Sequence, residues 1–205
     1  MNKLREIFGD KKVVGLAGEK SSGKTNNLMA LVEEFRKGNK ETPIFVYGLN
    51  EKTLKWVTEL GNVFEISSLK QLRDKENCLI ILEEFQKLNL NDRRYKDVLN
   101  EFIDFIYHNN NWVLFSSPSL REFNSVIGSK IERWVLKSLR VKDLINGSQL
   151  KDVVVDYKGR FKVLGDIRLK KNQMLSINEE CENIIEVDYI TKIDGKKLNI
   201  NIFEI

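Results

Sequence analysis

Short, continuous apolar runs alternate with stretches of helical period along the first two thirds of the chain. The runs have the length of strands and are rich in Val, Ile, Leu and Phe; they cover residues 13–17, 43–47, 63–66, 78–82 and 112–115. Because continuous apolarity indicates strands that are buried on both faces, the pattern predicts a parallel sheet covered by helices.

Amphipathic segments lie between these runs. Residues 26–37, 51–60 and 95–107 carry apolar side chains at helical spacing, and Ser68 can cap a shorter helix through residue 72. Strands that alternate with helices predict an α/β fold with a doubly wound, mainly parallel sheet. Ligands of such a sheet bind beyond the carboxyl ends of its strands.

The pattern changes after about residue 130. Residues 131–136 predict a strand and residues 141–145 a helical turn. Turn dipeptides at residues 158–159 and 194–195 then separate strand-like runs at residues 151–157, 161–164, 184–190 and 198–203. We therefore divide the chain into an α/β core, residues 1–145, and an antiparallel, β-rich extension packed on it, residues 146–205.

The first strand leads directly into a glycine-rich sequence of the pattern GxxxxGK[ST]: Gly18, Glu19, Lys20, Ser21, Ser22, Gly23, Lys24 and Thr25. In this phosphate-binding loop the backbone N–H groups point at phosphate oxygens, and the following helix adds the positive end of its dipole. Lys24 reaches the β- and γ-phosphates, and the Thr25 hydroxyl ligates Mg²⁺. The sequence therefore predicts ATP and Mg²⁺ as ligands; a glycine-rich turn without a ligand is the alternative.

Two acids follow the apolar run 79–82, as in a Walker B strand. Glu83 is expected to hold the metal through water, and Glu84 to polarise the attacking water. The usual first acid is Asp, and the longer Glu can shift the metal and slow turnover. The alternative interpretation is a pair of ordinary loop carboxylates.

Other polar groups complete the predicted catalytic set. Ser116 or Ser117 ends the next strand and can sense the γ-phosphate; we assign this role to Ser117, although Ser is also a turn former before Pro118. An arginine from a neighbouring subunit would stabilise the transition state. Five arginines are candidates, and each can equally be a solvated surface arginine. We prefer Arg94 and Arg121, which follow strand ends of the predicted site, over Arg93, Arg133 and Arg140.

Composition adds little to this picture. The chain has 205 residues and a formal net charge of +4, which permits a nucleic-acid partner without requiring one. Cys78 and Cys181 are far apart and fit no metal-ligand spacing, so we expect reduced cysteines. The charged first residues lack the apolar core of a signal peptide, and no apolar run has membrane-spanning length. We expect a cytoplasmic protein.

A basic stretch interleaved with aromatic residues covers residues 157–162, and Arg168, Lys170 and Lys171 follow it. On a hairpin such side chains can grip a nucleic-acid backbone without reading its sequence. A solvated hairpin whose lysines guard a sheet edge is the alternative.

Together these motifs resemble the FtsK/HerA-like superfamily of P-loop ATPases, over residues 13 to about 145. The stretch Glu83-Glu84-Phe85-Gln86 with Arg94 downstream resembles the zonula-occludens-toxin-like branch, which works in virion assembly of filamentous viruses. The resemblance implies a P-loop NTPase fold with a RecA-like sheet. It also implies an ATP-driven motor on DNA that forms a homo-oligomeric ring, often a hexamer. Capsid or other virion-assembly proteins are implied as partners, in the host cytoplasm or on the virion.

Three functions remain open from the sequence. A DNA-translocating or packaging ATPase predicts hydrolysis that DNA stimulates. An ATP-regulated assembly protein with slow hydrolysis is favoured by Glu83 in place of Asp and by Ser117 where the family has Gln. A small nucleotide kinase suits the length, but it would need arginines clustered around a second phosphate acceptor, and here they are scattered.

Overall fold

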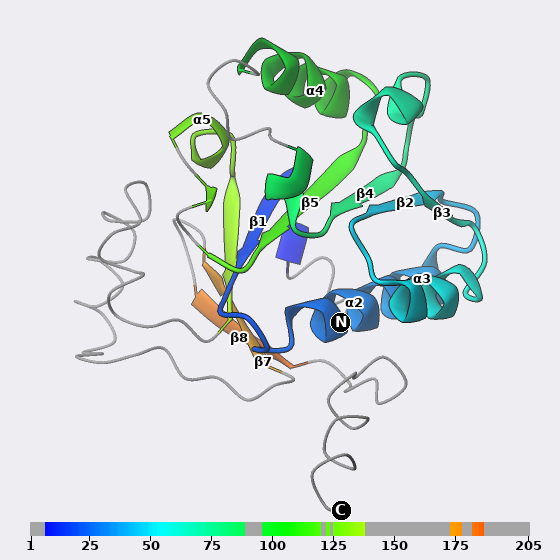
Figure 1. Ribbon diagram of the computed structural model, residues 1–205, viewed down its shortest axis with the longest axis vertical. Coiled ribbons are helices and arrows are strands. Elements are labelled where there is room, and N and C mark those ends of the chain that lie inside the picture. Colours follow the sequence, from blue (N-terminus) through cyan, green and yellow to red (C-terminus); the bar gives the residue numbers. More distant parts are fainter. Residues whose placement is uncertain are drawn as a thin grey trace, which may run out of the picture.

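The computed structural model describes residues 7–88, 96–119, 122–123, 125–137, 173–177 and 182–186. Within these residues one eight-stranded sheet has the order β3-β2-β4-β5-β1-β6-β7-β8 (Figure 1). The strands from β3 to β6 in this order pair in parallel, whereas β7 pairs antiparallel with β6 and β8. The predicted fold class, a mainly parallel α/β sheet with added antiparallel strands, is confirmed.

The strands are β1 (Val13–Ala17), β2 (Ile44–Tyr47), β3 (Val63–Glu65), β4 (Leu79–Leu82), β5 (Trp112–Ser117), β6 (Arg133–Leu136), β7 (Gln173–Ile177) and β8 (Glu182–Glu186). The helices are α2 (Lys24–Gly38), α3 (Glu51–Thr58), α4 (Lys96–His108) and α5 (Ser125–Gly128), with short 3₁₀ helices η1 (Leu69–Leu72) and η2 (Phe85–Leu88). Every element predicted between residues 13 and 117 is present, with ends that shift by a few residues. For η1, the Gln71 side chain accepts a hydrogen bond from the Ser68 backbone N–H at 3.1 Å.

Of the two described antiparallel strands, the sequence prediction missed one and found the other with a shifted start. It missed β7, because a five-residue segment with Ser at its fourth position has neither clean alternation nor continuous apolarity. It also placed the start of β8 two residues late, at residue 184, because pairing with β7 rather than local hydrophobicity sets that end: Ile177 lies opposite Glu182. The elements expected at residues 141–172 and 187–205, and the boundary at residue 145, lie outside the described residues.

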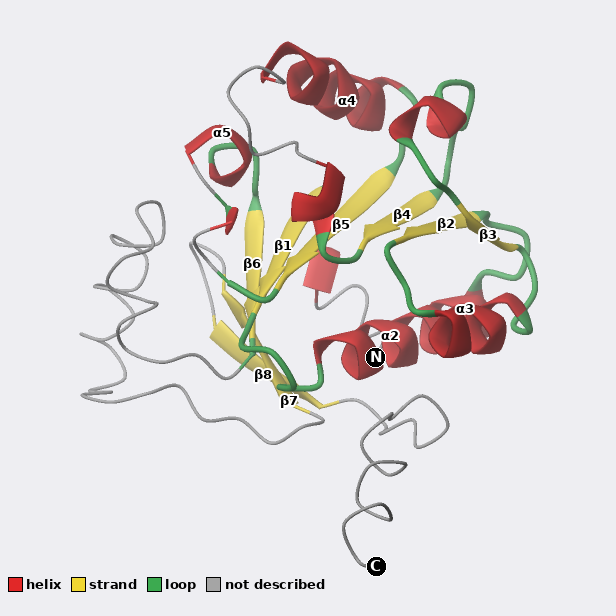
Figure 2. Ribbon diagram, viewed as in Figure 1, coloured by secondary structure: helices red, strands yellow, loops and turns green. Residues whose placement is uncertain are grey.

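Alternate side chains of each central strand enter two separate hydrophobic clusters. In β4, Ile80 and Leu82 pack in a cluster with residues of α4 and η2, whereas Leu79 and Ile81 pack with residues of α2 and α3. Helices accordingly cover both faces of the sheet (Figure 2). This burial on both sides explains why the strands read as continuous apolar runs.

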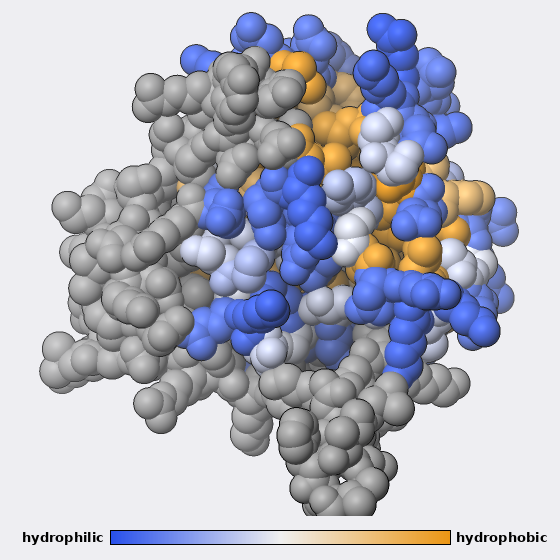
Figure 3. All heavy atoms as spheres, in the orientation of Figure 1, coloured by the Kyte–Doolittle hydropathy of each residue, from blue (hydrophilic) through white to orange (hydrophobic). Residues whose placement is uncertain are grey.

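The surface in view is mainly hydrophilic, with apolar side chains visible between α4 and the β2–β3 end of the sheet (Figure 3). The large apolar side chains that are exposed among the described residues include Phe64 of the edge strand β3. None of the described helices is long and apolar enough to cross a membrane. Cys78 is buried and unoxidised, and its thiol donates a hydrogen bond to Asn111 Oδ1 at 3.1 Å; burial raises the pKa of this thiol to about 11.

Gly48, which follows β2, allows a close backbone approach to the end of β4. Its φ is +81°, and a Cβ built on it would lie 2.1 Å from the carbonyl oxygen of Glu83. Gly61 has a similar φ of +78°, but a Cβ there would meet no atom within 4 Å. The two glycines therefore separate the effect of a left-handed backbone from that of lost space.

We predict that Gly61→Ala lowers the free energy of unfolding by about 1–2 kcal/mol, the usual conformational strain. Gly48→Ala is expected to lower it by about 2–5 kcal/mol, because a collision with Glu83 adds to the same strain. Urea titration of both variants measures the two losses. Equal losses would show that Gly48 does not act by making room for Glu83.

Candidate nucleotide-binding site

The loop between β1 and α2 has the backbone that phosphate binding requires. Ser21 and Gly23 adopt positive φ values of 68° and 91°, and α2 begins at Lys24, directly after them. The loop leaves the carboxyl end of β1, which lies between β5 and β6, and turns into the amino end of α2 (Figure 1). The helix dipole and the loop N–H groups therefore meet at the edge where the sequence predicted the ligand.

Lys24 is buried against its own loop. Its Nζ donates hydrogen bonds to the carbonyl oxygens of Gly18 at 2.8 Å and Glu19 at 3.0 Å, and 7% of the residue is exposed. Burial lowers the pKa of Lys24, and the nearby Glu83 and Glu84 charges act in the opposite direction. The ammonium thus lies inside the loop, where it can exchange carbonyl oxygens for phosphate oxygens.

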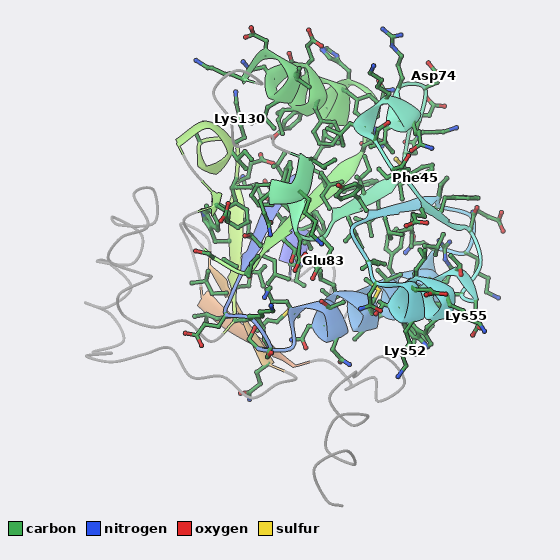
Figure 4. All side chains as sticks on the ribbon, in the orientation of Figure 1. Phe45, Lys52, Lys55, Asp74, Glu83 and Lys130 are labelled. Carbon is green, nitrogen blue, oxygen red and sulfur yellow. The ribbon has the colours of Figure 1, made fainter. Side chains whose placement is uncertain are left out.

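Thr25 and Glu83, the two predicted metal-binding residues, are in contact. Thr25 Oγ1 donates a hydrogen bond to Glu83 Oε1 at 2.7 Å, which joins the start of α2 to the end of β4. Glu83 is buried, and its second oxygen, Oε2, has no hydrogen-bond partner within the part of the chain that the structure describes. Figure 4 shows Glu83 between β4 and α2.

This pair fits Mg²⁺. Magnesium binds oxygen ligands and commonly uses one or two carboxylates together with substrate phosphates and water. A hydroxyl and a buried carboxylate with one unused oxygen supply such ligands. The structure brings the Thr of the phosphate loop and the first acid after β4 into contact. Their role as metal ligands stays a prediction.

Glu84, the predicted base, is directed elsewhere. It has a φ of +51°, which is strained for a residue with a side chain, and its carboxylate forms an ion pair with Lys87 of η2. The hydrogen bond to Glu84 raises the pKa of Lys87. Both side chains are partly exposed, so the pair can open at little cost.

The two serines at the end of β5 are fully buried and point to opposite faces of the sheet. Ser117 Oγ accepts a hydrogen bond from the Ser119 N–H at 3.3 Å. Leu82 pairs with Phe115, so continuing this register puts Ser116 beside Glu83. Ser116 Oγ is buried and has no hydrogen-bond partner among the described residues. By this register, Ser116 lies nearer than Ser117 to Glu83, one of the two predicted metal-binding residues. The sequence analysis assigned the sensor role to Ser117.

The arginines favoured as contacts from a neighbouring subunit, Arg94 and Arg121, lie outside the described residues, as do Arg93 and Arg140. Arg133 is described and lies at the first position of β6, opposite Val14. It is buried, and its guanidinium lies beside Gly9. This place is toward the amino end of the strands, away from the phosphate loop.

Lys137, which the sequence analysis missed, lies directly beside the loop. It follows β6, its backbone N–H donates to the Ala17 carbonyl at 2.8 Å, and its side chain is fully buried. Its Nζ donates a hydrogen bond to the Gln173 carbonyl of β7. Burial and then the charge of Lys24 lower the pKa of Lys137 to about 8. The sequence signal for Lys137 was its position directly after an apolar run. That signal does not reveal that Lys137 lies beside the loop, because only the strand order shows that β6 is next to β1.

Comparison with known proteins gives a result at the level of fold. The amino-acid sequence matches no protein-family model and no curated protein. Among solved structures, the genome packaging NTPase B204 from Sulfolobus turreted icosahedral virus 2, in complex with AMP, is similar with a TM-score of 0.60 at 12% identity, covering 87% of this chain and 98% of that chain. The DNA-packaging ATPase B204 from Sulfolobus Turreted Icosahedral Virus has a TM-score of 0.61 at 10% identity, with the same coverage.

A bacterial ATPase has a similar architecture. EssC (ATPases 2 and 3) from Geobacillus thermodenitrificans is similar with a TM-score of 0.57 at 9% identity, covering 90% of this chain and 40% of that chain. The chain has the fold of FtsK/HerA-like P-loop ATPases. The resemblance drawn from the motifs is thereby confirmed for the fold.

We predict that Glu83→Gln removes most of the gain in ATP affinity that Mg²⁺ provides, about 10- to 100-fold for one charged contact. Affinity in EDTA should change little, because Lys24 and the loop N–H groups remain. Calorimetric titration with and without Mg²⁺ measures this gain. Glu65→Gln, at an exposed carboxylate on β3, is the matched control. A normal Mg²⁺ gain in Glu83→Gln would exclude Glu83 from the metal site.

A second prediction concerns stability and pH. The pKa of Lys137 falls from 10.5 in the unfolded chain to about 8 in the fold, so the buried charge destabilises the protein fully below pH 8. Between pH 8 and 10 the wild type should gain stability relative to Lys137→Met, by about 3 kcal/mol at most, because the folded protein loses this proton first. Urea titration across this range measures the difference; a difference that does not vary with pH would contradict the prediction.

Proposed function

We propose that this protein is an ATP-hydrolysing motor that moves DNA, of the kind that packages viral genomes. The observation that carries the proposal is the hydrogen bond between Thr25 and Glu83, which joins the phosphate loop to the acidic end of β4. It lies within a fold shared with a genome packaging NTPase. A loop that only bound phosphate would not need a buried carboxylate beside its hydroxyl.

The residues divide the work of hydrolysis among them. The N–H groups of residues 18–25 bind the phosphates, and Lys24 releases the Gly18 and Glu19 carbonyl oxygens to contact them. Mg²⁺, when bound by Thr25 and Glu83, neutralises phosphate charge. Glu84 leaves Lys87 and accepts a proton from the attacking water.

Ser117 is proposed to sense the γ-phosphate. Ser116 is a second candidate for this role, because its buried hydroxyl has no hydrogen-bond partner among the described residues. An arginine from an adjacent subunit completes the site, with Arg94 and Arg121 as the candidates. The proposal therefore includes a homo-oligomeric ring, in which each site is incomplete without its neighbour. Capsid or other virion-assembly proteins are the proposed partners.

DNA is proposed as the load, bound through its backbone without regard to sequence. The net charge of +4 permits a polyanion as partner. The match covers nearly all of the packaging NTPase but less than half of the EssC chain. The similarity to secretion ATPases makes a polypeptide the competing load. A related structure is that of Thermomonospora curvata EccC in complex with a signal sequence peptide, at 13% identity and a TM-score of 0.53.

One observation favours a second candidate, an ATP-regulated assembly protein with slow hydrolysis. The ion pair with Lys87 engages the carboxylate of Glu84, the proposed base for the attacking water. In addition, Glu83 replaces the usual Asp. Such a protein would change its association state on binding ATP without much turnover. Solution mass measured with and without ATP tests this candidate.

We predict that double-stranded DNA at low salt raises the ATPase rate several-fold, and that Lys24→Ala and Glu84→Gln abolish both the basal and the stimulated rate. Single-stranded DNA, heparin and an unfolded polypeptide, tested in parallel, separate a DNA motor from a general response to polyanions or chains. Lys52→Ala and Glu65→Gln, both at exposed positions, serve as controls with wild-type rates.

Each outcome of this assay bears on a different part of the proposal. Hydrolysis that DNA leaves unchanged at low salt would contradict the DNA motor but not the ATPase. Stimulation by polypeptide alone would favour a secretion-type load. Absence of hydrolysis under all conditions would leave the assembly candidate.

A further inference from the structure

The Cβ of Lys137 packs directly against Gly18, the first glycine of the phosphate loop. A Cβ placed on Gly18 would lie 2.3 Å from the Cβ of Lys137 and 3.2 Å from its Cα. Separations under 3.0 Å do not occur between real Cβ atoms, so Gly18 and Lys137 fit together only because one of them has no side chain. The loop and this lysine therefore form one packed unit.

The side chain lies on the α2 face of the sheet. Val135, two residues earlier on β6, packs in the cluster that contains the α2 residues Leu28 and Met29, and side chains alternate between the two faces. The Gln173 carbonyl accepts from Lys137 Nζ and also, at 3.5 Å, from Nδ2 of Asn27 in the first turn of α2. The ammonium of Lys137 is thus close to the start of the helix that binds phosphate.

The strand order places Lys137 and Glu83 on opposite sides of the loop. From β4, which carries Glu83, the sheet continues through β5 and β1 to β6, which carries Lys137. A phosphate chain bound over the end of β1 would then have the metal-binding pair on one side. Lys137 would be on the other side.

The electrostatic surroundings of Lys137 favour an anion. Its side chain is fully buried, and burial and the charge of Lys24 both oppose the charge of its ammonium. A phosphate group beside it would offset both effects, because a buried ammonium is stabilised most by a close, desolvated negative charge. An ammonium is a compact donor that binds phosphate oxygens from any direction.

We propose that Lys137 is a second phosphate-binding lysine, which contacts the phosphate chain of the bound nucleotide from the β6 side of the loop. The proposal rests on the proposed nucleotide site. On nucleotide binding, the Lys137 ammonium would donate to a phosphate oxygen in place of, or in addition to, the Gln173 carbonyl oxygen. The competing explanation is a purely structural role, in which Lys137 only fastens β7 to the loop.

Nucleotide affinity separates these two roles. Lys137→Met keeps the length and the packing of the side chain but removes the charge. We expect the affinities for ATP, ADP and inorganic pyrophosphate to fall about 10- to 100-fold, with the affinity for adenosine unchanged. The matched control is Asn27→Ala, which removes the other donor to the same carbonyl and should leave all four affinities within about twofold of wild type.

The outcomes are distinct. Wild-type affinities in a folded Lys137→Met protein, judged by circular dichroism, would overturn the proposal and leave the structural role. Equal losses for adenosine and the phosphate ligands would also overturn it. Failure of the wild type itself to bind ATP would instead contradict the proposed function.

A measurement on the unmodified protein covers the case in which Lys137→Met does not fold. Acyl phosphates of AMP, ADP and ATP place a lysine-reactive carbonyl at successive positions along the phosphate chain. Peptide mapping by mass spectrometry should find acylation of Lys137 as well as Lys24, and excess ATP should suppress both. Acylation of Lys24 without Lys137 for all three reagents would overturn the proposal.

Discussion

Close approach of backbone at the carboxyl end of the sheet is the constraint on which the whole site depends. A loop that presents N–H groups to phosphate must lie tightly over the strand ends, and its neighbours must come near without colliding. Glycine makes this possible twice: Gly18 lies against Lys137 on one side of the site, and Gly48 lies against the Glu83 backbone on the other. The loop is therefore packed against Lys137 on one side and hydrogen-bonded through Thr25 to Glu83 on the other.

The site contains three buried charged side chains whose charges the surrounding protein stabilises poorly. Lys24, Glu83 and Lys137 are each at least nine-tenths buried, and burial opposes the charge of both lysines. Such groups cost stability, which a protein tolerates where they serve a ligand. A nucleotide that supplies negative charge between the lysines, and a cation beside Glu83, would stabilise the fold by mass action.

The sequence was sufficient for the parallel core because each signal there is local. A continuous apolar run, a glycine loop and an amphipathic helix identify β1, the loop and α2, and the acids after β4 follow from the same logic. It was insufficient where pairing between distant segments decides the structure. Strand β7 and the place of Lys137 beside Gly18 depend on β6 neighbouring β1, which no local pattern records. The face of the sheet toward which Ser116 and Ser117 each point depends on the pairing register of β5 with β4. A shift of one residue in this register would exchange the two faces.

The contacts of Lys24 have a consequence for how quickly ligand can come and go. The loop holds the Lys24 ammonium in its interior, hydrogen-bonded to two of its own carbonyl oxygens. Nucleotide binding is then a substitution, in which one set of oxygens replaces another around the same ammonium. The loop has little to reorganise on arrival of ligand, and its carbonyl groups compete for the lysine as soon as a phosphate leaves. Competition of this kind would limit the affinity for a bound phosphate group and speed its release.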